Sequence, residues 1–174
     1  MGKEGRPTPL DAATAVAGVV GDIWMTAESV DKVIVCGSVR RHRETVSDVD
    51  MLVVSRAATL AEVNPWSERW HCTDKQGWAD MHDVRCEFWL CPPESVGPMT
   101  LFLTGPASLN VFMRRRAQQW GMRLSQYGLF DSTGERLDPA VFVEEVQGEQ
   151  ALFAMLAMSW IAPEERDEWR SFVH

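Results

Sequence analysis

Two aspartates at the start of an apolar stretch are the residues of this sequence best suited to chemistry. Asp48 and Asp50 stand two positions apart, and the apolar run 51–54 follows them. Side chains alternate between the two faces of a strand, so both carboxylates project to one side if this segment is extended. Neighbouring carboxylates repel each other unless cations lie between them. The spacing therefore predicts a site for one or two hard divalent ions, with magnesium as the expected metal.

A candidate phosphate-binding segment precedes these aspartates. Residues 33–36 form an apolar run typical of a buried strand, and Gly37 and Ser38 follow it directly. Glycine lets the backbone approach a ligand closely, and a serine at a helix start leaves its hydroxyl and nearby amides facing outward. Arg41, with two further arginines nearby, adds planar cations that suit phosphate oxygens. A phosphate site followed by metal-binding acids is what nucleotidyl transfer requires.

Residues 83–91 predict a further strand with two different faces. One face carries Val84, Cys86, Phe88 and Leu90, and the other carries Arg85, Glu87 and Trp89. Arg85 and Glu87 share a face, which would be polar if it lines a binding cleft. An amphipathic helix within residues 8–30 is expected to support the sheet. Pro92, Pro93, Gly97 and Pro98 indicate a linker, and residues 106–121 predict a second helix that Gly121 can end.

These motifs resemble those of DNA polymerase family X, the polymerase beta-like branch of the nucleotidyltransferase superfamily. Gly37-Ser38-x-Arg40-Arg41, followed by Asp48-Val49-Asp50, is similar to the nucleotidyltransferase signature of that family. Leu103-Thr104-Gly105-Pro106, with Asn110 and Met113-Arg114, is similar to its nucleotide-binding segment. The pieces 126–130 and 160–166 resemble the C-terminal part of the family in the right order. The resemblance extends over about residues 30–170.

The resemblance implies roles for the acids and for the phosphate-binding segment. It makes Asp48, Asp50 and Glu87 the catalytic and metal-binding residues, holding two Mg²⁺ ions that Mn²⁺ can replace. Glu87 stands where the family usually has aspartate. Gly37, Ser38 and Arg41 are expected to hold the β- and γ-phosphates of the nucleotide.

Further nucleotide- and DNA-binding residues follow from the same resemblance. Phe102, Thr104 and Gly105 are expected to line the sugar pocket, and Asn110 to contact the incoming base. Arg85 is expected near the primer terminus and Arg114 on the templating side, whereas Trp89 stands where the family often has another arginine. Relatives turn sharply after Thr-Gly, often through a cis bond, and a following proline lowers its cost. Gly105–Pro106 is therefore a candidate cis peptide.

The expected fold is α/β (α+β). Residues 1–95 are expected to form a nucleotidyltransferase palm with a mixed sheet and flanking helices, and residues 96–174 a small C-terminal α+β subdomain. About thirty residues ahead of the first strand do not suffice for the lyase and helix-hairpin-helix domains of repair-type relatives, so a minimal form is expected.

The expected function is template-directed DNA synthesis of a short-gap or repair type, with dNTP and primer-template or gapped DNA as partners. One alternative is a template-independent nucleotidyltransferase that acts on nucleic-acid ends or on a small molecule. Another is an inactive nucleotide-binding module, against which the three filled acidic positions argue.

A monomeric, cytoplasmic protein is expected, and the composition predicts a hydrophobic core of substantial size. The chain has 174 residues, 45% of them hydrophobic, and no apolar run of eighteen. The net charge of −8 is unusual for a DNA-binding protein, because phosphate contacts normally come from a basic surface. Reduced cysteines in a cytosolic core are expected, and a zinc site is the alternative. The residues of that alternative are His71, Cys72, His82, Cys86 and Cys91.

Three tryptophans fall in one polar region, at positions 66, 70 and 78. Stacking on nucleic-acid bases is one interpretation of such aromatics. Packing against the sheet is the commoner fate of tryptophan and is the expectation here.

Overall fold

The computed structural model of the chain describes residues 6–65, 70–137 and 143–173. The chain divides into two compact units, Met1–Pro92 and Pro93–His174, which are described in turn. None of the described helices is long and apolar enough to cross a membrane.

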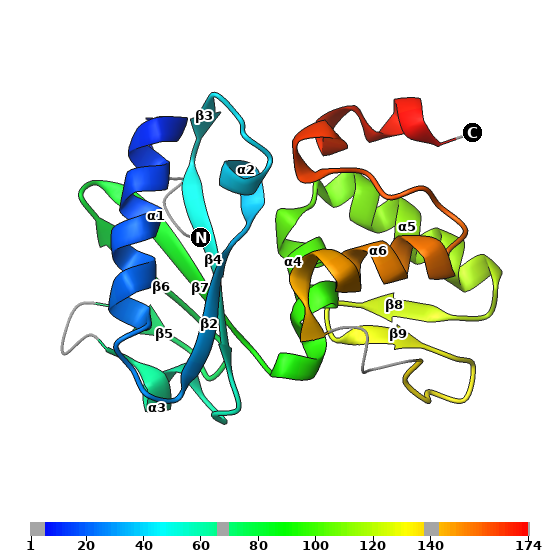
Figure 1. The fold of residues 1–174 in the computed structure, drawn as a ribbon, viewed down its shortest axis with the longest axis horizontal. Coiled ribbons are helices and arrows are strands. Elements are labelled where there is room, and N and C mark those ends of the chain that lie inside the picture. The colour runs from blue at the N-terminus through cyan, green and yellow to red at the C-terminus, as the bar shows by residue number, and fades with distance from the viewer. Residues whose placement is uncertain (1–5, 66–69, 138–142, 174) are drawn as a thin grey trace. The chain divides into compact units, whose positions relative to one another are not determined.

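The N-terminal unit is built on a mixed five-stranded sheet (Figure 1). Its strands follow the order β2-β4-β7-β6-β5, with β4 and β7 parallel and the other neighbours antiparallel. The mixed sheet with flanking helices confirms the predicted fold class. The elements of this unit are β1 (Thr8–Pro9), α1 (Leu10–Trp24), β2 (Val30–Val35), α2 (Gly37–Arg40), β3 (Thr45–Val46), β4 (Asp48–Ser55), α3 (Leu60–Val63), β5 (His71–Cys72), β6 (Gln76–Met81) and β7 (Val84–Cys91).

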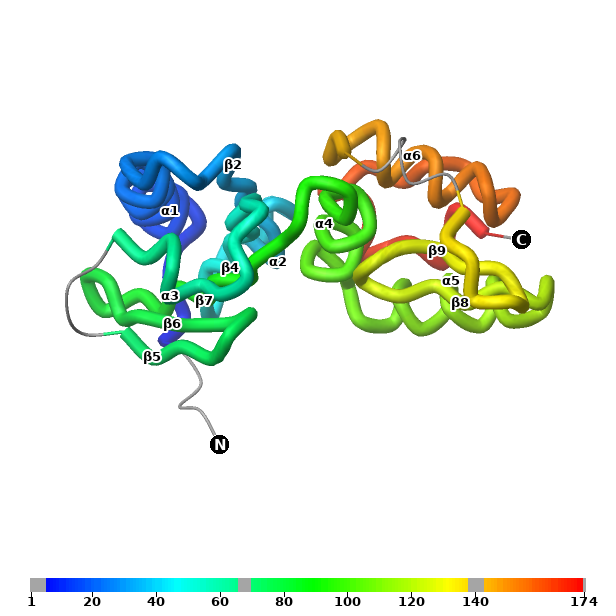
Figure 2. Tube along the Cα trace, turned by 90° about the horizontal axis from the view of Figure 1, so that it is seen from below, coloured from blue at the N-terminus to red at the C-terminus, as the bar shows by residue number. Residues whose placement is uncertain are grey.

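Helix α1 covers one face of this sheet (Figures 1 and 2). Its buried residues recur at helical spacing: Ala13, Ala17, Val20 and Trp24. They pack with the alternate, apolar residues of β4 and β7, such as Met51 and Phe88, and Trp24 meets Phe88 edge-on at 5.1 Å between ring centroids. The side chains on the other face of β4 and β7, which α1 does not cover, are therefore available to form a functional site.

The C-terminal unit packs three helices against a small hairpin. Its elements are η1 (Pro93–Ser95), α4 (Val96–Thr104), α5 (Ala107–Gln119), β8 (Arg123–Ser125), β9 (Gly128–Phe130), α6 (Glu145–Met155) and η3 (Pro163–Phe172). The core includes Leu109, Met113, Leu129 and Phe153, none of which is exposed. The unit thus has its own hydrophobic core.

The linker predicted from Pro92, Pro93, Gly97 and Pro98 is wrong in its second half. Gly97 and Pro98 lie in the first turn of α4, where a helix tolerates proline because that N–H has no intrahelical partner. Gly97 serves a close approach between helices, since a Cβ there would lie 2.6 Å from the Cα of Gly148 in α6. Local turn propensity was overridden here by packing between helices.

Candidate active site

The three predicted acidic ligands lie on two neighbouring strands. Strands β4 and β7 run parallel, and their register places Asp48 opposite Arg85 and Asp50 opposite Glu87. Residues opposite each other in a sheet project from the same face. Residues between them, such as Val49, are fully buried on the core side. The three carboxylates and Arg85 therefore share the face that α1 does not cover.

Burial raises the pKa of all three acids, and neighbouring carboxylates raise it further at Asp50 and Glu87. The pKa of Asp50 is raised to about 7, first by burial and then by the charges of Asp48 and Glu87. The guanidinium of Arg41 opposes that shift. Burial also raises the pKa of Asp48 and of Glu87, while Arg85 opposes both shifts. The carboxylates are thus close enough to repel one another, and a cation beside them would relieve the repulsion.

The chemistry of these side chains fits a hard divalent cation, which binds through carboxylate oxygens. Within residues 6–65, 70–137 and 143–173, no group of three or more His, Cys, Asp or Glu side chains is close enough to hold one ion. Like charges keep free carboxylates apart, and a cation draws them together. The fit to Mg²⁺ therefore rests on the carboxylate donors themselves and on the repulsion between their charges.

The turn at Gly37 is built around the carboxylate of Asp50. Gly37 has a φ of 60°, in the left-handed region that favours glycine. A Cβ at this position would lie 2.0 Å from Oδ2 of Asp50, so any side chain would displace the carboxylate. The N–H of Cys36 donates to the carbonyl oxygen of Asp50 at 2.8 Å, which ties the end of β2 to β4. Ser38 and Arg41 follow in and after α2, both partly buried.

The remaining predicted residues of the nucleotide site lie together in the C-terminal unit. The side-chain amide of Asn110 donates to the carbonyl oxygen of Phe102 at 2.8 Å. The guanidinium of Arg114 lies 5.3 Å from the centre of the Phe102 ring. Thr104 is fully buried, so its side chain packs inside the unit. The Gly105–Pro106 bond is cis, as predicted.

Arg85 lies in a stack that the sequence did not reveal. Its guanidinium carbon lies 3.7 Å from the centre of the Trp78 ring, and that ring stacks on His71 with centroids 4.2 Å apart. Only 7% of Arg85 is exposed, and its Nε lies 3.6 Å from Asp80, which is too far for a hydrogen bond. The alternation of Gln76, Trp78 and Asp80 was the one feature of the sequence that could have indicated that Trp78 shares a face of the sheet with Arg85.

The other tryptophans of this region differ in their surroundings. Trp70 packs edge-on against Trp24 and Phe88 in the core, as expected for packing against the sheet. Trp78 lies on the opposite face, beside the acids. Trp66 lies outside the described residues. The four cysteines are in the reduced thiol form, with Cys72 exposed and the other three buried.

Comparison with known proteins places this site in a polymerase beta fold. Residues 99–167 match the DNA polymerase beta thumb family. The crystal structure of Leishmania infantum polymerase beta in a ternary P/T complex matches with a TM-score of 0.71 and 22% identity, over 93% of this chain and 77% of that chain. The ternary gap complex of the same protein matches with a TM-score of 0.73 and 22% identity, over 93% of this chain and 71% of that chain. No curated protein sequence matches the chain.

The chain therefore has the polymerase beta fold, and residues 99–167 in its C-terminal unit are similar to the polymerase beta thumb. These matches confirm the resemblance to DNA polymerase family X, as that of a polymerase beta-like protein.

Proposed function

We propose that the protein is a DNA-directed DNA polymerase that adds a dNMP to a primer 3′-hydroxyl, filling short gaps. The observation that carries this proposal is the group of three acids, Asp48, Asp50 and Glu87, on the free face of a polymerase beta-type sheet. Titratable groups with pKa values shifted by burial and by each other are typical of catalytic sites.

The proposed reaction forms a bond between the primer 3′-oxygen and the α-phosphorus of a dNTP and breaks the bond to the leaving pyrophosphate. Asp48 and Asp50 would hold two Mg²⁺ ions, which Mn²⁺ can replace, and Glu87 would complete the site of one of them. Bound divalent ions would neutralise the triphosphate and lower the pKa of the attacking hydroxyl. Glu87, whose pKa is raised by burial, would accept the proton of that hydroxyl at its carboxylate.

The other residues of the site would bind and orient the nucleotide. Gly37 and Ser38 offer the turn, and Arg41 the cation, for the β- and γ-phosphates. In the C-terminal unit, the segment Phe102–Gly105 is proposed for the sugar and Asn110 for the base. Arg114 is proposed for the template strand and Arg85 for the primer terminus.

A primer-extension assay with matched DNA substrates tests this proposal. The same labelled primer is offered in a one-nucleotide gap, on an open template and as a single strand, with each dNTP alone and Mg²⁺ present. We expect addition of one nucleotide in the gapped substrate, chosen by the template base. Addition that ignores the template base would favour a template-independent transferase, and no addition on any substrate would favour a nucleotide-binding module.

A further inference from the structure

A row of side chains continues from the acids across the sheet. Strand β6 pairs with β7 so that Trp78 lies opposite Glu87, and β5 pairs with β6 so that His71 lies opposite Trp78. Since Glu87 is itself opposite Asp50, these four side chains form one row across four strands. The next row on the same face places Gln76 opposite Trp89. Aromatic side chains thus begin immediately beside the proposed catalytic acid.

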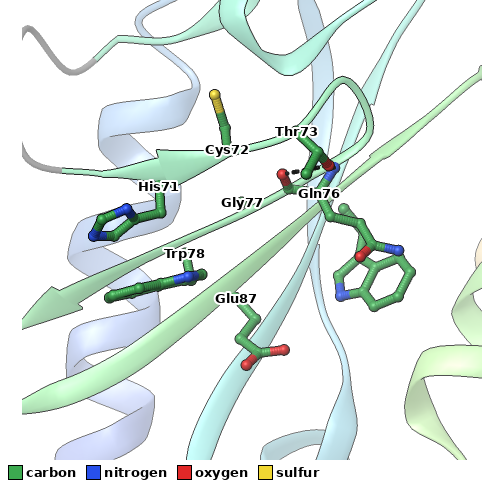
Figure 3. Close-up of a pocket in the computed structure, with 8 residues that line it drawn as sticks. His71, Cys72, Thr73, Gln76, Gly77, Trp78 and Glu87 are labelled. Carbon is green, nitrogen blue, oxygen red and sulfur yellow. Dashed lines mark hydrogen bonds between the residues drawn. The ribbon is translucent and has the colours of Figure 1, made fainter. Parts of the chain in front are cut away.

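The members of these two rows on β5, β6 and β7 line a pocket of about 310 Å³ (Figure 3). Glu87, Trp78 and Trp89 line it from the sheet. The turn between β5 and β6 closes another side, where the hydroxyl of Thr73 donates to the carbonyl oxygen of Gln76 and accepts from its N–H. The pocket therefore has a preformed wall and lies directly beside Glu87, the proposed catalytic acid.

The stack of Arg85, Trp78 and His71 holds one side of the pocket in place. The Trp78 and His71 rings are inclined by only 28°, and the buried guanidinium of Arg85 lies on Trp78. Figure 3 shows the His71 ring beside that of Trp78, with the Glu87 carboxylate nearby. A stacked arrangement of this kind restricts the rotamers of its members. The pocket is thus ready to accept a planar group at little cost in side-chain order.

The charge and size of the pocket define what it can hold. Its described lining has one carboxylate, that of Glu87, and neither lysine nor arginine, so it suits a neutral ring better than a phosphate. Its volume is at the lower end of the roughly 300–1,000 Å³ of small-molecule sites, which fits one nucleoside and not a base pair. Aromatic side chains beside a strand are how proteins bind unpaired bases without regard to sequence.

We propose that this pocket binds the unpaired 3′-terminal base of a primer strand, so that the protein binds single-stranded or frayed 3′ ends. The inference rests on the proposed function in one respect: Glu87 meets the 3′-hydroxyl, so the nucleotide that carries this hydroxyl is the one within reach of the pocket. Trp89 and His71 contact the base, and Trp78 positions Arg85.

Binding of an oligonucleotide with 2-aminopurine at its 3′ end tests the proposal without any turnover. The probe is titrated with the full chain in EDTA, once as a single strand and once paired to a template. We expect the protein to quench the fluorescence of the single strand and to leave that of the paired end nearly unchanged. The substitution W89A should weaken binding of the single strand about ten-fold, and W89F should restore most of it.

Two further variants guard against a change in folding. His71 is exposed, so H71A removes one aromatic wall without opening the core, and it should weaken binding of the single strand several-fold. Trp120 is 48% exposed in the C-terminal unit, outside the pocket, and W120A should bind both probes as the unchanged protein does. Equal binding of the single strand by W89A, H71A and the unchanged protein would overturn the proposal. The proposal would also be overturned if W89A and H71A lost affinity equally for the single strand and for the paired strand.

The outcome is separable from that of the proposed function. If the protein fills the gap but does not quench the fluorescence of the single strand, the proposed role of the pocket is overturned and the proposed polymerase function stands. A protein that quenches the single strand but extends no primer supports the pocket and overturns the polymerase.

Discussion

The carboxylate of Asp50 packs against the backbone of Gly37 and shares a row with Glu87. The turn proposed to bind phosphate and the acids proposed to bind metal are therefore one piece of structure and not two adjacent motifs. The positive φ of Gly37 and the space that Asp50 occupies both exclude a side chain at this position. The spacing of Gly37 and Asp50 in the sequence is thus explained by a direct contact.

Substitution of Gly37 by alanine should inactivate the site while the fold persists. The new Cβ must displace the Asp50 carboxylate, and a misplacement of about 1 Å can cost about 100-fold in rate. Left-handed backbone strain should add about 1–2 kcal/mol of destabilisation. Single-nucleotide incorporation and thermal melting measure the two effects. G18A is the matched control, because a Cβ on that helical glycine meets nothing within 4 Å and should leave the rate unchanged.

The raised pKa of Asp50 predicts how the stability of the metal-free protein depends on pH. Its folded-state pKa of about 7 lies above the ordinary value of 3.8, so the folded chain retains a proton that the unfolded chain releases. The stabilising contribution of this group is complete below pH 4 and is lost as the pH rises through 7. D50N removes the penalty and should be more stable than the unchanged protein at pH 8, by up to a few kcal/mol.

Thermal melting in EDTA at pH 5 and pH 8 measures this effect. The advantage of D50N should shrink at the lower pH. Mg²⁺ should stabilise the unchanged protein more at pH 8 than at pH 5, because its ligands must be deprotonated. The same pH dependence in both proteins would show that Asp50 is not held in a protonated state.

At the scale of the elements, the strands that carry the acids could be predicted from the sequence. The side chains that pack against those strands from β6 could not. The alternation in 83–91 and the spacing of Asp48 and Asp50 predicted the shared face, because side-chain direction in a strand follows from period two alone. The stack of Trp78 on Arg85 depends on the register of β6 against β7, which alternation does not specify. Both the stack and the pocket therefore became visible only in the structure.

The end of the chain is held to α6 by an ion pair that sequence spacing does not indicate. Nη1 of Arg166 donates to Oε1 of Glu149 at 2.8 Å, and both residues are fully buried. Nε of Arg166 donates to the carbonyl oxygen of Ile161. The partners are 17 residues apart, so only tertiary packing brings them together.

Loss of charge at Glu149 should destabilise the C-terminal unit strongly. E149Q leaves the Arg166 guanidinium buried without a counter-ion, which typically costs about 3–5 kcal/mol. E165Q, at an exposed position of η3, should change the free energy of unfolding by less than about 0.5 kcal/mol. Urea unfolding compares the two variants. Similar values for both would mean that the buried pair contributes nothing beyond packing.

At the scale of the whole molecule, the net charge of −8 would limit how the proposed DNA substrate is bound. Arginines gather in two parts of the sequence, at 40, 41 and 43 and at 114, 115, 116 and 123, while acids dominate elsewhere. Contacts with phosphates are therefore expected from few side chains. Stacking on bases does not depend on net charge, which makes the aromatic pocket a useful second source of affinity.

DNA affinity should consequently be weak and should fall as salt is added. With only a few phosphate contacts, binding of a gapped duplex should weaken about 10- to 100-fold between 50 mM and 200 mM salt. Fluorescence anisotropy across salt concentrations measures the slope. An affinity that hardly changes with salt would show that the arginine clusters do not contact phosphates.

The central claim is that Asp48, Asp50 and Glu87 form the metal-dependent catalytic site of a polymerase. The most direct test is single-turnover incorporation into a one-nucleotide gap by D48N, D50N and E87Q, with Mg²⁺ or Mn²⁺. Each substitution removes a charge and a metal ligand at nearly constant volume, so we predict folded proteins with rates at least about 100-fold lower. D22N, at an exposed position of α1, should retain the rate of the unchanged protein. Rates within a few-fold of the unchanged protein for D48N and D50N would contradict the claim.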